Sequence, residues 1–151
     1  MIRLRPIATV GCERLVHEND HWGKVISTVT LAPDIPEESL DGIETFSHVE
    51  IVFYMNQIKP EAVIWGAKHP RDNSAWPKVG IFAHRARNRP NRIGLSVARL
   101  IKREGRVLTV QGLDALDGTP VLDIKPVFRE FLPREEIRQP AWVEEMAKEY
   151  Y

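Results

Sequence analysis

Short apolar runs of strand length, interrupted by proline and glycine, make up most of the chain. They predict strands at residues 7–11, 24–31, 48–55, 79–84, 96–102, 107–113 and 121–125. Apolar and polar residues alternate through 27–31 and 107–111, which is typical of strands with one buried face. Residues 51–55 are apolar on both faces, so we expect them to form a central, well-buried strand.

Other patterns predict turns and helices. Residues 103–106 separate two strand-like runs, which predicts a hairpin turn in which Gly105 adopts a positive φ. Proline followed by acidic residues predicts a one-turn helix at 36–40. Trp142, Met146 and Tyr150 recur every four residues through 140–151, as in an amphipathic helix. We expect this helix to pack on the rest of the fold or on a second subunit, with simple core packing as the plainer alternative.

Strands outnumber helices in this prediction, and 11 prolines and 9 glycines are spread along the chain, which argues against a helical bundle. The pattern predicts a mostly β fold, an antiparallel β-barrel that is closed or nearly closed and carries a short C-terminal helix. Residues 60–78 form the longest irregular stretch. Its aromatic side chains, Trp65 and Trp76 among them, favour a functional loop over a passive connection.

Composition narrows the classes of protein. The 151 residues fit a single domain, and the one cysteine, Cys12, excludes an internal disulfide. No apolar run is long enough to span a membrane, and no secretory segment is recognisable at the N-terminus, so we expect a cytoplasmic protein. The formal net charge is zero, but residues 85–106 carry eight bases and one acid while 34–50 carry six acids and no Lys or Arg. This segregation favours a polyanion-binding face with an acidic back.

Several common sites are excluded by their missing motifs. The chain has no G-x-x-x-x-G-K-[ST] phosphate loop, no G-x-G-x-x-G after a strand and no G-x-S-x-G turn. These absences count against ordinary nucleotide-binding folds and the usual doubly wound methyltransferase. The five histidines have no metal-ligand spacing, so we expect no metal site.

Three segments carry candidate chemistry. A loop of arginine and proline follows residue 84. We expect its proline, which fixes φ and limits the freedom of the loop, to hold Arg85, Arg87 and Arg89 as a rigid array suited to carboxylate or phosphate. The plainer alternative is a solvated loop with salt bridges to the acids of 34–50. Residues 113–126 contain an Asp-Gly-Thr-Pro turn whose exposed backbone groups can hydrogen-bond a nucleoside edge, although most such turns only reverse the chain. Asn56 and Gln57 end the strand at 48–55, where they line a site or merely cap the strand.

These segments together resemble the YaeB/TrmO (TsaA-like) family. The resemblance rests on F-S-H-V-E-I-V-F, on G-I-F-A-H-R-A-R-N-R-P-N-R-I-G-L-S and on L-D-A-L-D-G-T-P-V-L-D-I-K-P, and it covers residues 7 to about 133. It divides the chain into a barrel domain at 1–133 and a helical tail of the same domain at 134–151. It implies a β-barrel methyltransferase that uses S-adenosylmethionine, forms homodimers and N-methylates N6-threonylcarbamoyladenosine beside the anticodon of tRNA.

The resemblance also assigns residues. It implies cofactor contacts from Asn56, Gln57, Arg85, Leu95, Asp114, Leu116, Asp117, Gly118 and Thr119, and contacts to tRNA phosphates from Arg87, Arg89 and Arg92. Leu95 and Leu116 suit an adenine ring, and Arg85 suits a carboxylate. Family members commonly have a P-R-Q triplet in the first long loop, and here Asp20-His21-Trp22 stand near its place, with Trp22 as a candidate for stacking on a base or on adenine.

The implied reaction is a direct in-line methyl transfer in which the protein mainly positions the reactants. His84 or Asp114 accepts the proton that leaves the nitrogen, or a water chain does. Two other readings remain open. The chain is a barrel that binds RNA or cofactor without catalysis, or it is a methyltransferase with a different small-molecule or nucleoside acceptor.

Overall fold

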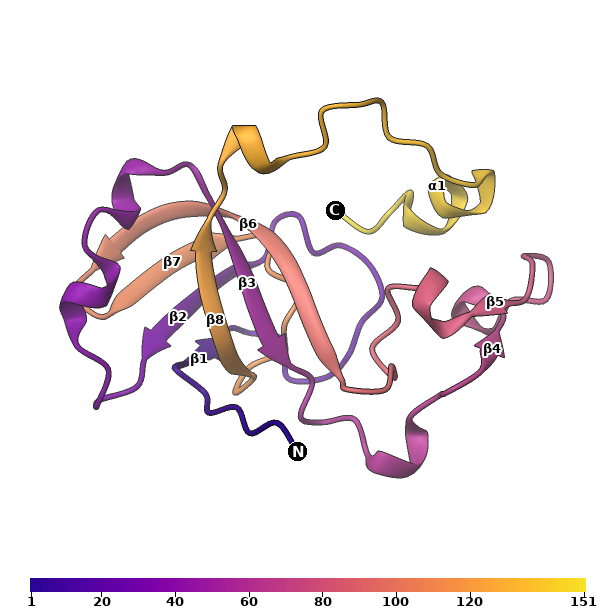
Figure 1. Cartoon of the computed structure of the whole chain (residues 1–151), viewed down its shortest axis with the longest axis horizontal. Coiled ribbons are helices and arrows are strands. Elements are labelled where there is room, and N and C mark those ends of the chain that lie inside the picture. The colour runs from indigo at the N-terminus through magenta and orange to yellow at the C-terminus, as the bar shows by residue number, and fades with distance from the viewer.

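Six antiparallel strands close into a barrel in the computed structural model, which describes all residues 1–151 (Figure 1). The barrel strands are β1 (Ala8–Gly11), β2 (Ile26–Leu31), β3 (His48–Tyr54), β6 (Ile93–Glu104), β7 (Val107–Gln111) and β8 (Pro120–Pro126). Their order around the barrel is β1-β2-β7-β6-β3-β8, and β8 closes it by pairing with β1. The predicted fold class, a closed antiparallel barrel with a short C-terminal helix, is confirmed.

The helices are short and lie outside the barrel. They are η1 (Glu37–Leu40), η2 (Ile43–Thr45), η3 (Pro60–Ala62), η4 (Pro70–Asp72), η5 (Ile81–Ala83), η6 (Arg129–Phe131) and the one α-helix, α1 (Ala141–Ala147). The predicted turn of helix after Pro36 is present as η1. The predicted helix at 140–151 is present, but it ends at Ala147, and residues 148–150 form a turn in which the Tyr150 N–H donates to the Ala147 carbonyl. None of these helices has the length and apolarity that a membrane span requires.

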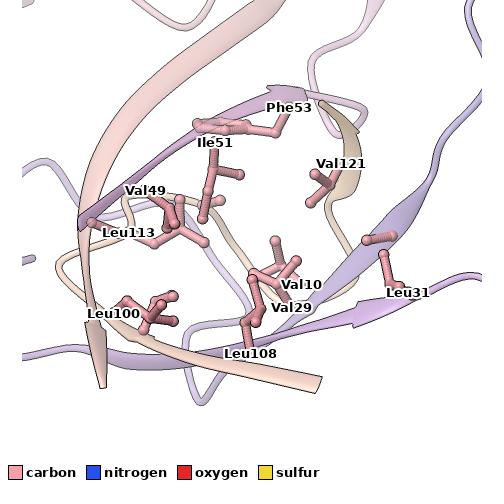
Figure 2. Packing of buried hydrophobic residues seen from close by; sticks show 14 of the residues in the cluster. Val10, Val29, Leu31, Val49, Ile51, Phe53, Leu100, Leu108, Leu113 and Val121 are labelled. Carbon is pink, nitrogen blue, oxygen red and sulfur yellow. The ribbon is translucent and has the colours of Figure 1, made fainter. Parts of the chain in front are cut away.

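Alternating side chains of the strands fill the interior of the barrel (Figure 2). In β3, Val49, Ile51 and Phe53 point inward and are almost completely buried, while the intervening residues are half-buried. β3 lies between β6 and β8, as its apolar sequence predicts. Sixteen buried apolar residues form this one cluster, so the barrel interior is a packed core that holds the loops at its ends in place.

A close contact between β3 and β6 requires a glycine. Gly94 pairs with Phe53, and a Cβ on Gly94 would lie 2.3 Å from Cε2 of the Phe53 ring. Only a residue without a side chain lets the aromatic ring lie flat against the neighbouring backbone. The second glycine of the G-I-F-A-H-R-A-R-N-R-P-N-R-I-G-L-S segment, Gly94, is therefore explained by packing inside the barrel.

The strand predicted at 79–84 is wrong for most of its length. Only β5 (Val79–Gly80) is extended, and it pairs with β4 (Ala67–Lys68) in a separate two-stranded sheet outside the barrel (Figure 1). Residues 81–83 form η5, in which Ile81 is buried and Phe82 is exposed. The apolar run has no period of two to distinguish a strand from a helical turn, so it gave no reliable signal. The predicted hairpin turn is confirmed, with Gly105 at φ +58°.

Candidate functional site

Three long connections leave the barrel at the same end. They join β1 to β2, β3 to β6 and β7 to β8, and the register of the strands places their endpoints together. The residues predicted to contact cofactor lie on the second and third of these connections and on the start of β6. The connection from β1 to β2, residues 12–25, contacts both.

Asp114 connects three parts of the chain at this end. Its Oδ1 accepts a hydrogen bond from Ser96 Oγ of β6, and its Oδ2 accepts one from the Tyr150 hydroxyl of the C-terminal tail. Ser96 is buried, and Asp114 and Tyr150 are half-buried. Both carboxylate oxygens are therefore engaged, and the carboxylate has a fixed orientation.

Arg85 attaches the arginine–proline loop to the start of β6, next to Ser96. Its Nη2 donates to the Leu95 carbonyl oxygen at 2.7 Å, one residue before Ser96. Burial raises the pKa of Tyr150 well above its ordinary value, the charge of Asp114 raises it further, and the charge of Arg85 opposes the rise. The charges of Arg85 and Asp114 thus act on the same phenol, although the two residues are far apart in the sequence.

The C-terminal tail, residues 149–151, lies against the first connection. The N–H of His21 donates to the Glu149 carbonyl and the N–H of Trp22 to the Tyr150 carbonyl, both at 2.8 Å. A Cβ on Gly23 would lie 2.6 Å from the Tyr151 carbonyl carbon, so this approach requires glycine. In Figure 1 the C-terminus accordingly lies beside the loop that follows β1. Burial, and next the charge of Asp114, raise the pKa of Tyr151 as they raise that of Tyr150, so the tail brings both phenols close to Asp114.

The first connection also reaches the other predicted cofactor residues. Asn56 and Gln57 are exposed directly after β3, and Gln57 Nε2 lies 3.5 Å from the Leu15 carbonyl oxygen. Asp117 accepts a hydrogen bond from the Cys12 N–H at 3.1 Å. Arg14 lies 4.3 Å above the Trp22 ring. Trp22 itself is only 1% exposed, so the prediction that it stacks on a base or on adenine is wrong for this conformation.

The Asp-Gly-Thr-Pro turn is less open than predicted. The N–H groups of Asp117, Gly118 and Thr119 donate to the carbonyls of Arg14, Val10 and Leu116 at 2.9, 2.8 and 3.1 Å. Two of these bonds run to β1 and the loop after it, because the turn continues the pairing of β8 with β1. The predicted exposure of these backbone groups is wrong.

The three residues before this turn, 114–116, have backbone N–H groups that are not used within the chain. The N–H groups of Asp114, Ala115 and Leu116 donate to no group of the chain, and Ala115 is 2% exposed. Buried backbone N–H groups in proteins nearly always have a partner. The backbone N–H groups of residues 114–116 are therefore the donors that this segment can offer to a ligand, and Leu116 among them is half-buried.

His84 has a structural position. It is buried, its Nε2 lies 3.1 Å from the carbonyl oxygens of both Lys68 and Val79, and its ring centroid is 6.2 Å from that of Trp142. It thus joins both strands of the small sheet and contacts α1. Of the two candidate proton acceptors, Asp114 is the one that shares contacts with the predicted cofactor residues.

The three arginines predicted to contact RNA have different environments. Arg87 is exposed and has no hydrogen bond to the rest of the chain. Arg89 donates to the His84 carbonyl at 2.9 Å, and Arg92 donates to the Ile58 carbonyl at 2.6 Å and lies over the Tyr54 ring. None of the three pairs with an acid; the acidic segment is instead engaged by Arg103, which lies 3.0 Å from Asp41. The alternative of a loop neutralised by those acids is therefore wrong.

Sequence reasoning missed Ser96, Tyr150 and His17 as site residues. Ser96 had a signal, because it is a polar residue in the inward-facing phase of β6. Tyr150 was placed on an amphipathic stripe, but nothing in the sequence named its partner. Partial burial lowers the pKa of His17, its hydrogen bond with Asn19 opposes this, and the charges of Arg87 and Asp114 act on it with opposite signs.

No group of three or more His, Cys, Asp or Glu side chains is arranged to hold a metal ion. A hollow of about 210 Å³ lies elsewhere, on the outer face of β3 and β8, and contains none of the predicted site residues. It is lined by Glu50, Lys125, Pro126, Val127, Phe128, Phe131 and Leu132.

Comparison with known proteins identifies the family. The family model of the tRNA-methyltransferase O N-terminal domain matches residues 17–131, which include the second and third connections and most of the first. The chain belongs to the TrmO family. The resemblance inferred from the sequence motifs is thereby confirmed.

Individual relatives agree. A Pyrococcus abyssi protein described as a probable S-adenosyl-L-methionine-binding protein is 40% identical over 117 residues, which are 78% of this chain and 60% of that protein. The human tRNA (adenine(37)-N6)-methyltransferase is 42% identical over 105 residues, 70% of this chain and 23% of that one. The crystal structure of TrmO from Pseudomonas aeruginosa superimposes with a TM-score of 0.73 at 30% identity, covering 94% of this chain and 62% of that one. The chain thus spans less than two thirds of these relatives.

Proposed function

We propose that this chain is an S-adenosylmethionine-dependent methyltransferase that modifies adenine N6 in tRNA, and that its acceptor is N6-threonylcarbamoyladenosine beside the anticodon. The observation that carries the proposal is the meeting of Arg85, Ser96 and Asp114 at one end of a TrmO-family barrel. Relatives named for S-adenosylmethionine and for tRNA adenine methylation supply the chemical class.

The residues present fit this cofactor. Ala115 provides a buried backbone N–H that no group of the chain uses, and the neighbouring N–H groups are equally free. Arg85 keeps guanidinium donors beyond the one given to Leu95, which suit the cofactor carboxylate. Leu95, 44% exposed, and Leu116 offer apolar surface to an adenine ring. When bound, S-adenosylmethionine supplies an electrophilic methyl group on a sulfonium sulfur.

The chain's own residues then orient the acceptor and accept the one proton that leaves its nitrogen. We assign the proton to Asp114, because its carboxylate lies among the cofactor residues while Nε2 of His84 is engaged by two carbonyl groups. Ser96 keeps the carboxylate oriented through Oδ1. The Tyr150 hydroxyl has to release Oδ2 before an acceptor nitrogen can use that oxygen. The phosphates of the RNA face Arg87 first, since it is the exposed and unengaged arginine, with Arg89 and Arg92 beside it.

Cofactor binding is tested by calorimetry with S-adenosylmethionine on the wild-type chain, Arg85→Ala and Arg99→Ala. Arg99 is an exposed arginine further along β6 and serves as the matched control. We expect saturable binding by wild type and Arg99→Ala, and weakening by about tenfold or more in Arg85→Ala, because a charge-assisted hydrogen bond contributes about 1.5–3 kcal/mol. Absence of binding by the wild type would leave only the reading of a non-catalytic RNA-binding barrel.

The acceptor is tested by mass spectrometry of nucleosides from tRNA incubated with the chain and cofactor. A methyl group on threonylcarbamoyladenosine supports the full proposal. A methyl group on unmodified adenosine supports an adenine methyltransferase and refutes the specific acceptor. Cofactor binding with no transfer to any tRNA nucleoside would point to a different small-molecule acceptor.

We further propose that the chain is a cytoplasmic homodimer. Val97 and Ile101 point outward from β6 on either side of the exposed Arg99 and are each 47% exposed, apolar surface that a second copy would cover. Sedimentation of the wild type and of Val97→Glu tests this, since the charge should dissociate the dimer without unfolding the barrel. A monomeric wild type at micromolar concentration would refute the dimer.

A further inference from the structure

Two large aromatic side chains are exposed on the connection from β3 to β6, residues 55–92, which lies outside the barrel and is called the arm below. Trp65 is 75% exposed and Phe82 is 77% exposed. The Ile81 N–H donates to the Gly66 carbonyl at 2.8 Å, and this bond extends the pairing of β4 with β5. Trp65 is the residue before Gly66, and Phe82 is the residue after Ile81. Trp65 and Phe82 therefore lie next to this last paired position, where the two chain segments of the small sheet diverge.

This end of the small sheet lies next to the arginine–proline loop that follows residue 84. The N–H of Ile64 donates to the Asn88 carbonyl at 2.8 Å, so Trp65 is one residue away from the middle of that loop. Phe82 precedes Arg85 by three residues. Arg87 and Arg89 pair with no acid, and Arg87 is exposed, whereas Lys68 and Arg71 of the same arm pair with Asp72 at 3.0 Å and with Asp20 at 2.6 Å. Exposed aromatic rings thus lie beside uncompensated positive charge.

We propose that Trp65 and Phe82 form a stacking platform for unpaired bases of an RNA loop whose phosphates are held by the adjoining arginines. This rests on the proposed function and adds to it the part of the chain that reads the single-stranded character of the substrate. Aromatic rings beside a basic groove bind single strands because every base presents a face on which a ring can stack. A protein partner would have no need for the adjoining positive charges, so RNA is the occupant that the charge favours.

The test measures the affinity of the full chain for a fluorescent anticodon stem-loop RNA and for the same stem closed as a duplex. The variants are Trp65→Ala, Phe82→Ala, Trp65→Phe and, as the matched control, Phe131→Ala. Phe131 is 84% exposed and lies on η6, away from the arm (Figure 1). All three side chains are mostly exposed, and circular dichroism verifies that each of the four variants is folded.

We expect Trp65→Ala to weaken stem-loop binding about 5- to 150-fold, the range for loss of one stacked base, with Phe82→Ala in the same direction. Trp65→Phe should recover most of the affinity, and Phe131→Ala should bind as the wild type does. The dependence of affinity on salt should be unchanged in Trp65→Ala but shallower in Arg87→Ala, by about 0.7 in the logarithmic slope.

The platform is overturned if Trp65→Ala and Phe131→Ala bind the stem-loop equally, if the wild type prefers the duplex, or if Trp65→Ala changes the oligomeric state in place of RNA affinity. Methyl transfer to tRNA by the wild type is assayed in parallel. Transfer with no effect of Trp65→Ala on binding refutes the platform alone. Loss of affinity in Trp65→Ala without any transfer refutes the proposed function and leaves the platform standing.

Discussion

Tyr150→Phe isolates the hydrogen bond that fastens the C-terminal tail to the site. The substitution keeps the half-buried ring and removes only the hydroxyl that donates to Asp114. A hydrogen bond to a charged group contributes about 1.5–3 kcal/mol to stability. Because Asp114 keeps its bond from Ser96 and the ring is only half-buried, we expect the lower part of this range, about 1.5–2 kcal/mol.

The effect has a characteristic pH dependence. Burial and the neighbouring Asp114 raise the pKa of Tyr150 in the folded chain above its ordinary value of 10.0. The folded state therefore favours the protonated phenol, and this contribution is complete below pH 10 and is lost as the pH rises toward the folded-state pKa. The difference in unfolding free energy between wild type and Tyr150→Phe should shrink above pH 10.

Urea unfolding followed by circular dichroism, at intervals from pH 7 to pH 11, measures both quantities. Tyr54→Phe is the matched control, since the Tyr54 ring lies under Arg92 and its hydroxyl forms no hydrogen bond with the chain. We expect that control to stay within about 0.5 kcal/mol of wild type. A Tyr150→Phe difference that is equally small at pH 7, or one that stays constant up to pH 11, would refute the assigned role of the hydroxyl.

Three further substitutions test other contacts. Gly94→Ala should lower the unfolding free energy by about 1–3 kcal/mol, because its Cβ would lie 2.3 Å from the Phe53 ring and overpack the core; a thermal midpoint equal to that of wild type would contradict this. Gly105→Ala should cost about 1 kcal/mol, since the turn holds residue 105 at φ +58°; urea unfolding measures it, and no loss would mean that the turn tolerates a side chain. The hydrogen bond from Arg71 lowers the pKa of Asp20 below its ordinary value of 3.8, so its contribution is present above that pH and is lost as the pH falls through the lower folded-state pKa. Asp20→Asn should therefore lose stability less steeply than wild type on acidification below about pH 4, and identical acid transitions would show that the pair is not formed.

The barrel was predictable because its strands carry local signals. Alternation in β7, the apolar run of β3 and the glycine at the β6–β7 turn each depend on residues near one another in sequence. The strand predicted at 79–84 was wrong because it has no such local signal. Consecutive apolar residues such as Ile81 and Phe82 fit a strand and a helical turn equally well, and the conformation depends on a hydrogen bond to residue 66.

The site was predictable in its segments and not in its contacts. Motifs marked the arginine loop and the Asp-Gly turn, but the groups that pair with Asp117 and Gly118 lie on β1 and the loop after it, more than a hundred residues earlier. The sequence pattern placed Tyr150 on the apolar face of a helix. Its hydroxyl in fact donates a hydrogen bond to Asp114, 36 residues earlier in the chain. Such partners depend on the assembled fold, and no local pattern specifies them.

The way the barrel closes has a consequence for how the chain is synthesised. β8 is the only strand that pairs with both β1 and β3, so each of these has an unpaired edge until residue 126 has left the ribosome. β2 and β3 likewise wait for β7 and β6, which lie far along the chain. Pairing across such long separations is slow, and unpaired edges recruit strands from other molecules. A nascent chain interrupted before β8 is therefore the form of this protein most exposed to aggregation and most in need of a chaperone.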